Sequence, residues 1–122
     1  MSTTIVKKDM SFYRGDDISF DVVFRDPNDN NNPLDITGWI VSFTIKKSNS
    51  DPDAKAVIQK DFKDFVTPTN GTASISVSHT ETASLKGGYF YDIQAKRADD
   101  IVFTVVSGSI DFDEDTTRRI PT

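Results

Sequence analysis

The sequence predicts an all-β protein, an antiparallel β-sandwich of about seven strands. Apolar and polar residues alternate along most of the chain, which is the pattern of strands that bury one face. Clusters of Asn, Asp, Gly and Pro separate the alternating segments, and helical periodicity is almost absent. A chain of 122 residues is long enough for one domain with an ordinary core.

The first half of the chain predicts two strong strands. Apolar side chains occupy every second position from Ile18 to Phe24, and again from Trp39 to Ile45. Because successive side chains of a strand point to opposite faces, each segment buries one face and exposes the other. Between them, the stretch 26–35 is rich in Asp, Asn and Pro, so we expect a surface loop there.

The middle of the chain predicts an edge strand, a turn and a half-buried strand. Residues 56–62 alternate weakly, and the lysines in and around them suit an exposed edge. The turn at 67–71 ends in Asn-Gly, which readily adopts positive φ. Residues 73–77 then alternate with serines, so the solvent face of this strand is expected to be rich in hydroxyl groups.

The last third predicts one short helical turn and two long strands. Ser78 and Glu81 have the spacing of a capping box, so we expect a helical turn near residues 79–86. The strands follow over residues 89–95 and 101–112, where the alternation resumes.

Aromatic side chains are expected to supply much of the core. The chain has nine Phe, three Tyr and one Trp, and each such side chain buries roughly 150–250 Å². We expect Trp39 to be the central core residue. The predicted core consists of Phe20, Val22, Phe24, Trp39, Val41, Phe43, Ile45, Ile75, Val77, Leu85, Tyr89, Tyr91 and Ile93.

The reactive side chains favour a protein that is not an enzyme. The chain has no cysteine, and His79 is its single histidine, so neither a nucleophile with its base nor a common zinc site can be assembled from these residues. We therefore expect His79 to be a surface turn residue. Phe90 and Tyr13 are candidates for outward-facing aromatics, so weak glycan binding stays open as an alternative.

Oxygen-bearing side chains offer three further candidates, and all are weak. The loop 26–35 begins like a calcium-binding pattern, but Asn31 and Thr37 stand where that pattern needs glycine and glutamate. The carboxylates of Asp111, Asp113, Glu114 and Asp115 could be offered to a divalent ion, but such a run is more often a solvated edge. The acidic pairs at 16–17 and 99–100, with Asp64, could supply paired carboxylates for glycoside chemistry, but they lie in predicted turns, where Asp is common. We therefore expect no metal ion and no cofactor.

Charge and hydropathy argue against two classes of partner, nucleic acids and membranes. Fourteen basic and nineteen acidic residues give a net charge of −5, the wrong sign for binding to nucleic-acid phosphates. No stretch approaches the roughly 20 apolar residues of a membrane span, and the N-terminal segment lacks the apolar run of a secretory signal. We expect no nucleic-acid or membrane partner, and synthesis in the cytoplasm of the producing cell.

Five segments carry a resemblance to a known family. They are residues 13–26, 33–47, 70–77, 82–97 and 106–112. Their order resembles the immunoglobulin-like modules of tailed-bacteriophage virion proteins, in particular the N-terminal domain of the baseplate upper protein family.

The resemblance implies an immunoglobulin-like sandwich over residues 10–113, between an N-terminal arm at 1–9 and a C-terminal tail at 114–122. It also implies a tyrosine corner, in which Tyr89 or Tyr91 bonds back to the backbone at the turn into its strand.

The function implied by the resemblance is that of a noncatalytic structural protein of the virion, in a tail, baseplate or collar, which anchors fibres or receptor-binding proteins. A head decoration protein and a carbohydrate- or host-surface-binding module of the same fold are the alternatives. The expected partners are other virion proteins and copies of the chain itself. Docking is expected through strand edges and both termini, with Ile5, Val6, Arg118 and Arg119 as candidate docking residues.

Overall fold

The computed structural model describes residues 6–7, 9–26, 28–48 and 50–113, which form a β-sandwich; the expected all-β class is confirmed. The strands are β1 (Val6–Lys7), β2 (Met10–Tyr13), β3 (Ile18–Val23), β4 (Arg25–Asp26), β5 (Asn32–Pro33), β6 (Ile40–Lys46), β7 (Ile58–Phe62), β8 (Thr72–Val77), β9 (Gly87–Lys96) and β10 (Val102–Asp113). The helical segments are the 3-10 turns η1 (Asp53–Lys55) and η2 (Pro68–Asn70) and the helix α1 (His79–Thr82).

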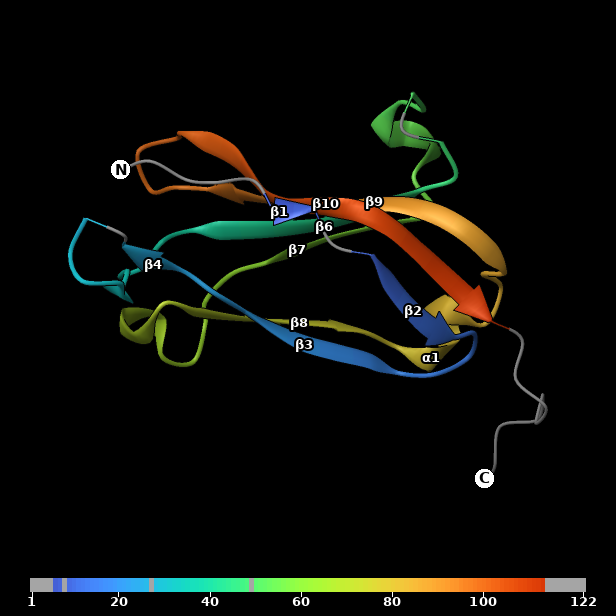
Figure 1. Cartoon of the computed structure of the whole chain (residues 1–122), viewed down its shortest axis with the longest axis horizontal. Helices are drawn as coiled ribbons and strands as arrows, with labels where there is room; N and C mark the ends of the chain where they lie inside the picture. The colour runs from blue at the N-terminus through green and yellow to red at the C-terminus, as the bar shows by residue number, and fades with distance from the viewer. Residues whose placement is uncertain (1–5, 8, 27, 49, 114–122) are drawn as a thin grey trace.

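The sandwich consists of one large and one small sheet (Figure 1). The large sheet has the strand order β1-β10-β9-β6-β7, and β2 also pairs with β10; the small sheet contains β3 and β8. β3 and β8 lie across from the large sheet in Figure 1, so the core is the layer between them. The loop expected before β6 contains a further short hairpin of β4 and β5.

The large sheet is mixed, which differs from the purely antiparallel arrangement expected from the sequence. β1 and β2 both run parallel to β10, with Val6 opposite Val106 and Phe12 opposite Phe112. These two strands have two and four residues, which is too short for an alternating pattern to identify them. β1 and β2, near the start of the chain, therefore belong to the same sheet as β10, the last described strand.

Phe43 occupies the centre of the core, where sequence reasoning placed Trp39. The Phe43 side chain is fully buried and meets Phe20 and Tyr91 edge-on, with ring centroids 5.7 and 6.0 Å away. Trp39 is also buried, but it precedes β6 and packs between Phe24 and Phe103 near the loops. The sequence pattern gives both positions the same inward parity, so it could not tell which one is central.

Most of the predicted core residues lie in one buried cluster, and two lie at its margin. Phe20 and Val22 are only partly buried; both belong to β3, which pairs with β8 alone among the described strands. Ile36 is fully buried although it lies in a loop, where periodicity gives no signal. The buried members of the predicted set are Phe24, Trp39, Val41, Phe43, Ile45, Ile75, Val77, Leu85, Tyr89, Tyr91 and Ile93.

The chain makes the expected corner at the start of β9. The hydroxyl oxygen of Tyr89 accepts a hydrogen bond from the backbone N–H of Lys86, at 3.2 Å. This is the geometry of a tyrosine corner. Of the two tyrosines that the resemblance left open, Tyr89 therefore makes this bond.

α1 is a single turn that hydrogen bonds with the β2–β3 connection hold in place. The Ser78 N–H donates to Glu81 Oε1 at 3.2 Å, as the capping-box spacing predicts. Arg14 donates to the carbonyl of Ala83, at 2.7 Å from Nη2, and the buried Thr82 hydroxyl donates to the carbonyl of Asp16 at 2.8 Å. The helix ends at Thr82, earlier than expected. No helix in the described parts of the chain has the length and apolar character needed to cross a membrane.

Gly71 joins the end of β3 to the start of β8, at one end of the small sheet. Its φ is +73°, a conformation that glycine adopts without the strain a Cβ would bring. Its carbonyl accepts the Phe24 N–H at 2.8 Å, and an added Cβ would lie 2.4 Å from the Phe24 oxygen. The predicted Asn-Gly turn is therefore a tightly packed junction.

Candidate functional site

The histidine and the acidic pairs, which are the candidates for catalysis or metal binding, do not all lie together in the structure. His79 lies at the start of α1, where its Nδ1 is 3.0 Å from Asp17 Oδ1. The backbone N–H of His79, and then its ring, hold the pKa of Asp17 below its ordinary value. The acidic pair at 99–100 lies in the β9–β10 turn, at the opposite end of the sandwich from α1 (Figure 1).

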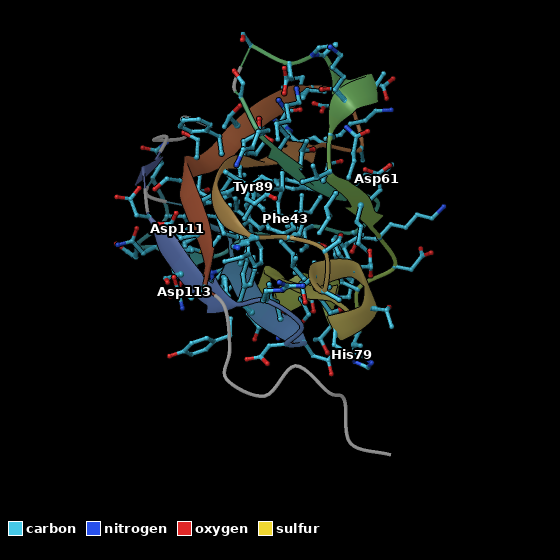
Figure 2. The ribbon with its side chains drawn as sticks, turned by 90° about the vertical axis from the view of Figure 1, so that its right-hand side faces the viewer. Phe43, Asp61, His79, Tyr89, Asp111 and Asp113 are labelled. Carbon is cyan, nitrogen blue, oxygen red and sulfur yellow. The ribbon has the colours of Figure 1, made fainter. Side chains whose placement is uncertain are left out.

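The carboxylates on the strands also lie apart. Figure 2 shows Asp61 of β7 on one side of the molecule and Asp111 and Asp113 of β10 on the other, with Phe43 and Tyr89 between them. In the part of the chain that the structure describes, no three acidic or histidine side chains gather closely enough to hold a metal ion. The loop considered for calcium uses Asp26 internally, because its Oδ1 accepts the Asn28 N–H at 2.9 Å.

Unpaired strand edges are the main feature that could bind a partner. β3 and β8 pair with each other, and within the described residues neither has a neighbour on its other side. β7 likewise has β6 on one side only. An unpaired edge presents a row of N–H and C=O groups to which another strand can add.

Lys60 makes the free edge of β7 unfavourable for the addition of another strand. Lys60 lies opposite Phe43 of β6, so its side chain emerges on the inward face between Ile58 and Phe62. An inward-pointing charge on an edge strand disfavours the addition of another strand, because pairing would bury the charge. β8 contains neither lysine nor proline, and its register with β3 has no bulge. The β8 edge is therefore the better template.

The β8 edge adjoins a hollow lined by the end of β7, the loop that follows it and the first residues of β8, which we call the β8 groove. It has a volume of about 290 Å³ and is lined by side chains that include Phe62, Phe65, Val66, Thr72 and Ser74. Val66 is fully exposed, and Phe62 and Phe65 are half-buried. The groove thus offers apolar surface beside free backbone groups.

An ion pair joins the two layers on the same side of the sandwich. Lys60 Nζ lies 3.0 Å from Glu81 Oε1 of α1. This contact with Lys60, together with the Ser78 N–H, holds the pKa of Glu81 below its ordinary value. The pair connects edge strand β7 to the helix that follows β8.

The predicted docking residues fall mostly outside the described chain. Val6 lies in β1, where it pairs with Val106 of the same molecule. The docking role of Val6 stays a prediction. Ile5, Arg118 and Arg119 lie outside the described residues.

Sequence reasoning did not find the β8 groove. Phe65 and Val66 lie in a loop without periodicity, so nothing in the pattern marks them as a surface. The available signal was Lys60, which has inward parity between Ile58 and Phe62. A charge at such a position indicates an edge strand that is closed to pairing.

No protein-family model matches the chain, and no curated protein matches it with significance.

Proposed function

We propose that this protein is a noncatalytic structural component of a tailed-phage virion, in the tail, baseplate or collar, which assembles through strand edges and termini and anchors fibres or receptor-binding proteins. Its partners are other virion proteins and further copies of the chain. The resemblance of the five sequence segments to virion modules supports the proposed identity. The β8 edge supports the mode of assembly.

The observation that carries the mode of assembly is the small size of the second sheet. In the described part of the chain this sheet contains β3 and β8 alone, so unpaired backbone groups run along both of its sides. A strand from a neighbouring subunit that adds to β8 gains main-chain hydrogen bonds, and its side chains can enter the β8 groove. Burial of Val66 and Phe65 then contributes about 25 cal/mol per Å² of apolar surface removed from water.

Location in the particle is the first test. We expect cryo-electron microscopy of phage particles that encode this chain to show ordered copies on the tail, baseplate or collar, with a neighbouring strand along β8. Copies on the capsid would favour the head decoration alternative. Absence of the chain from every particle would overturn the proposal.

A matched pair of variants tests the edge itself. Val66→Asp places a charge at the mouth of the β8 groove, whereas Val102→Asp places the same charge at an exposed position on β10. Both side chains are exposed, at 102% and 56%, so both variants should fold. We expect Val66→Asp to lower incorporation into particles by at least about tenfold, equivalent to about 1.4 kcal/mol of binding, while Val102→Asp incorporates normally. Equal incorporation of the two would exclude the groove as the contact.

A further inference from the structure

The outer face of the large sheet carries a second hollow, which the proposed assembly edge does not use. Its volume is about 290 Å³, near the lower end of the range for ligand pockets. The residues that line it and matter here are Thr44, Lys46, Phe90, Asp92, Thr104 and Ser107. We call it the Asp92 hollow.

The strand register brings these residues together from three strands. Asp92 of β9 lies between Thr44 of β6 on one side and Ser107 of β10 on the other. Phe90 lies opposite Lys46 in the next row on the same face. The floor of the hollow therefore has one row of a carboxylate between two hydroxyls, beside a row that pairs an aromatic ring with an ammonium group.

Two irregular features border this floor. The pairing of β10 with β9 shifts register between Thr104 and Val106, and bulges of this kind are often found next to binding sites, where they redirect side chains. On the other side, the η1 segment stands above the outer side of the large sheet (Figure 1). Lys46 Nζ lies 2.7 Å from Asp53 Oδ1 of η1, which holds the segment beside the hollow.

The Asp92 carboxylate is left without a hydrogen-bond donor. Among the described residues none donates to it, although the side chain is partly buried and burial raises its pKa. Lys46 forms its ion pair with Asp53, and no ion pair joins it to Asp92, although the charge of Lys46 partly offsets the rise in the pKa of Asp92. A ligand that donates hydrogen bonds to a half-buried acceptor of this kind binds favourably, because the acceptor is otherwise unpaired.

The chemistry of the lining selects the ligand. The carboxylate accepts hydrogen bonds, the Lys46 ammonium donates them, and the Thr and Ser hydroxyls do both. A ligand that matches all of them must carry donors and acceptors side by side. Phe90 is 40% exposed at the edge of the hollow, so it presents apolar ring surface to the same ligand.

We propose that the Asp92 hollow binds one neutral pyranose ring of a glycan. Adjacent hydroxyls of the sugar donate to Asp92, the hydroxyls of Thr44 and Ser107 complete the polar contacts, and the C–H face of the ring packs on Phe90. A guanidinium or ammonium ligand could also approach Asp92 and Phe90, but it carries no acceptor for the donors of the lining.

The test is a titration of the isotope-labelled full chain followed by NMR. The probes are methyl α-D-glucopyranoside, methyl β-D-galactopyranoside and the methyl glycoside of N-acetylglucosamine, each tested separately, with arginine as the cationic comparison. We expect one or more of the sugars to shift the backbone amide signals of Thr44, Asp92 and Ser107. A roughly millimolar Kd is expected for a ligand of this size.

Variants distinguish binding at the Asp92 hollow from nonspecific binding elsewhere on the surface. Phe90→Ala and Asp92→Asn should each weaken the sugar by about tenfold or more, and thermal unfolding will show that both remain folded. Tyr13→Ala is the matched control, because Tyr13 is an exposed aromatic on β2, at 54%, that does not line the hollow. Unchanged spectra with all three sugars, shifts only with arginine, or equal weakening by Tyr13→Ala would each overturn the proposal. None of these results depends on the β8 edge.

Discussion

Single residues at the centre of the sandwich set its stability. Phe43 touches rings from both layers, Phe20 in the small sheet and Tyr91 in the large one. Both partners meet it edge-on, an arrangement that aromatic pairs favour beyond simple burial. Trp39 makes similar contacts nearer the loops. The centre of the core is thus a single side chain that joins two layers.

We expect Phe43→Ala to lower the free energy of unfolding by about 3–5 kcal/mol, because it leaves a cavity between the sheets. Urea titration at neutral pH measures this loss. Phe90→Ala removes the same side chain from an exposed position on the outer face, so its cost should stay below about 1 kcal/mol. Similar losses for the two variants would show that Phe43 is not central.

At the scale of elements, α1 depends on charged contacts that respond to pH. Glu81 bonds Lys60 and the Ser78 N–H, and these contacts lower the pKa of Glu81 from its ordinary value of 4.5. A folded pKa below the unfolded one means that the unfolded chain takes up the proton more readily. The stabilisation is therefore present above about pH 4.5 and is lost as the pH falls through the lowered folded value.

We expect Glu81→Gln to lower the free energy of unfolding by about 0.5–1 kcal/mol at pH 7, since the pair is partly exposed to solvent. At pH values below the folded pKa of Glu81 the variant and the parent should become equally stable. Chemical denaturation at a series of pH values measures both limits. Lys60→Met removes the other partner and should show the same convergence; a pH-independent difference would contradict the role given to the ion pair.

The longer elements could be predicted from the sequence, and the shorter ones could not. Alternation identifies β3, β6, β8, β9 and β10, and the Ser78–Glu81 spacing identifies α1. β1 and β4 have two residues each, so no period exists to be read. Their pairing depends on partners far along the chain, as with Val6 and Val106.

The binding surfaces were largely hidden from the sequence for a related reason. The Asp92 hollow exists because register aligns Thr44, Asp92 and Ser107, which are separated by many residues of chain. Alternation gives each of them outward parity, but it does not say which outward residues are neighbours. Phe90 was the part of this hollow that sequence reasoning did single out, as an outward aromatic.

For the whole molecule, long-range pairing governs how the chain folds. β1 and β2 pair with β10, and β3 pairs with β8, which comes much later in the chain. The cost in chain entropy of closing such long loops must be met before the contacts form, so folds of this type fold slowly.

We expect refolding from urea on the millisecond-to-second scale. Trp39 is the single tryptophan and is buried in the native state, so stopped-flow fluorescence follows the formation of the core directly. Folding in microseconds would indicate that local structure dominates, contrary to the topology described.

The parallel pairing of β2 with β10 also determines how the molecule bears tension. Met10 lies opposite Ile110 and Tyr13 opposite Asp113, so the two strands run in the same direction. A pull toward the N-terminal end of β2 and toward the C-terminal end of β10 slides one strand along the other. The hydrogen bonds of the pair are then loaded together in shear, whereas strands peeled apart break one bond at a time. The junction between β2 and β10 is therefore arranged to resist tension along the strands.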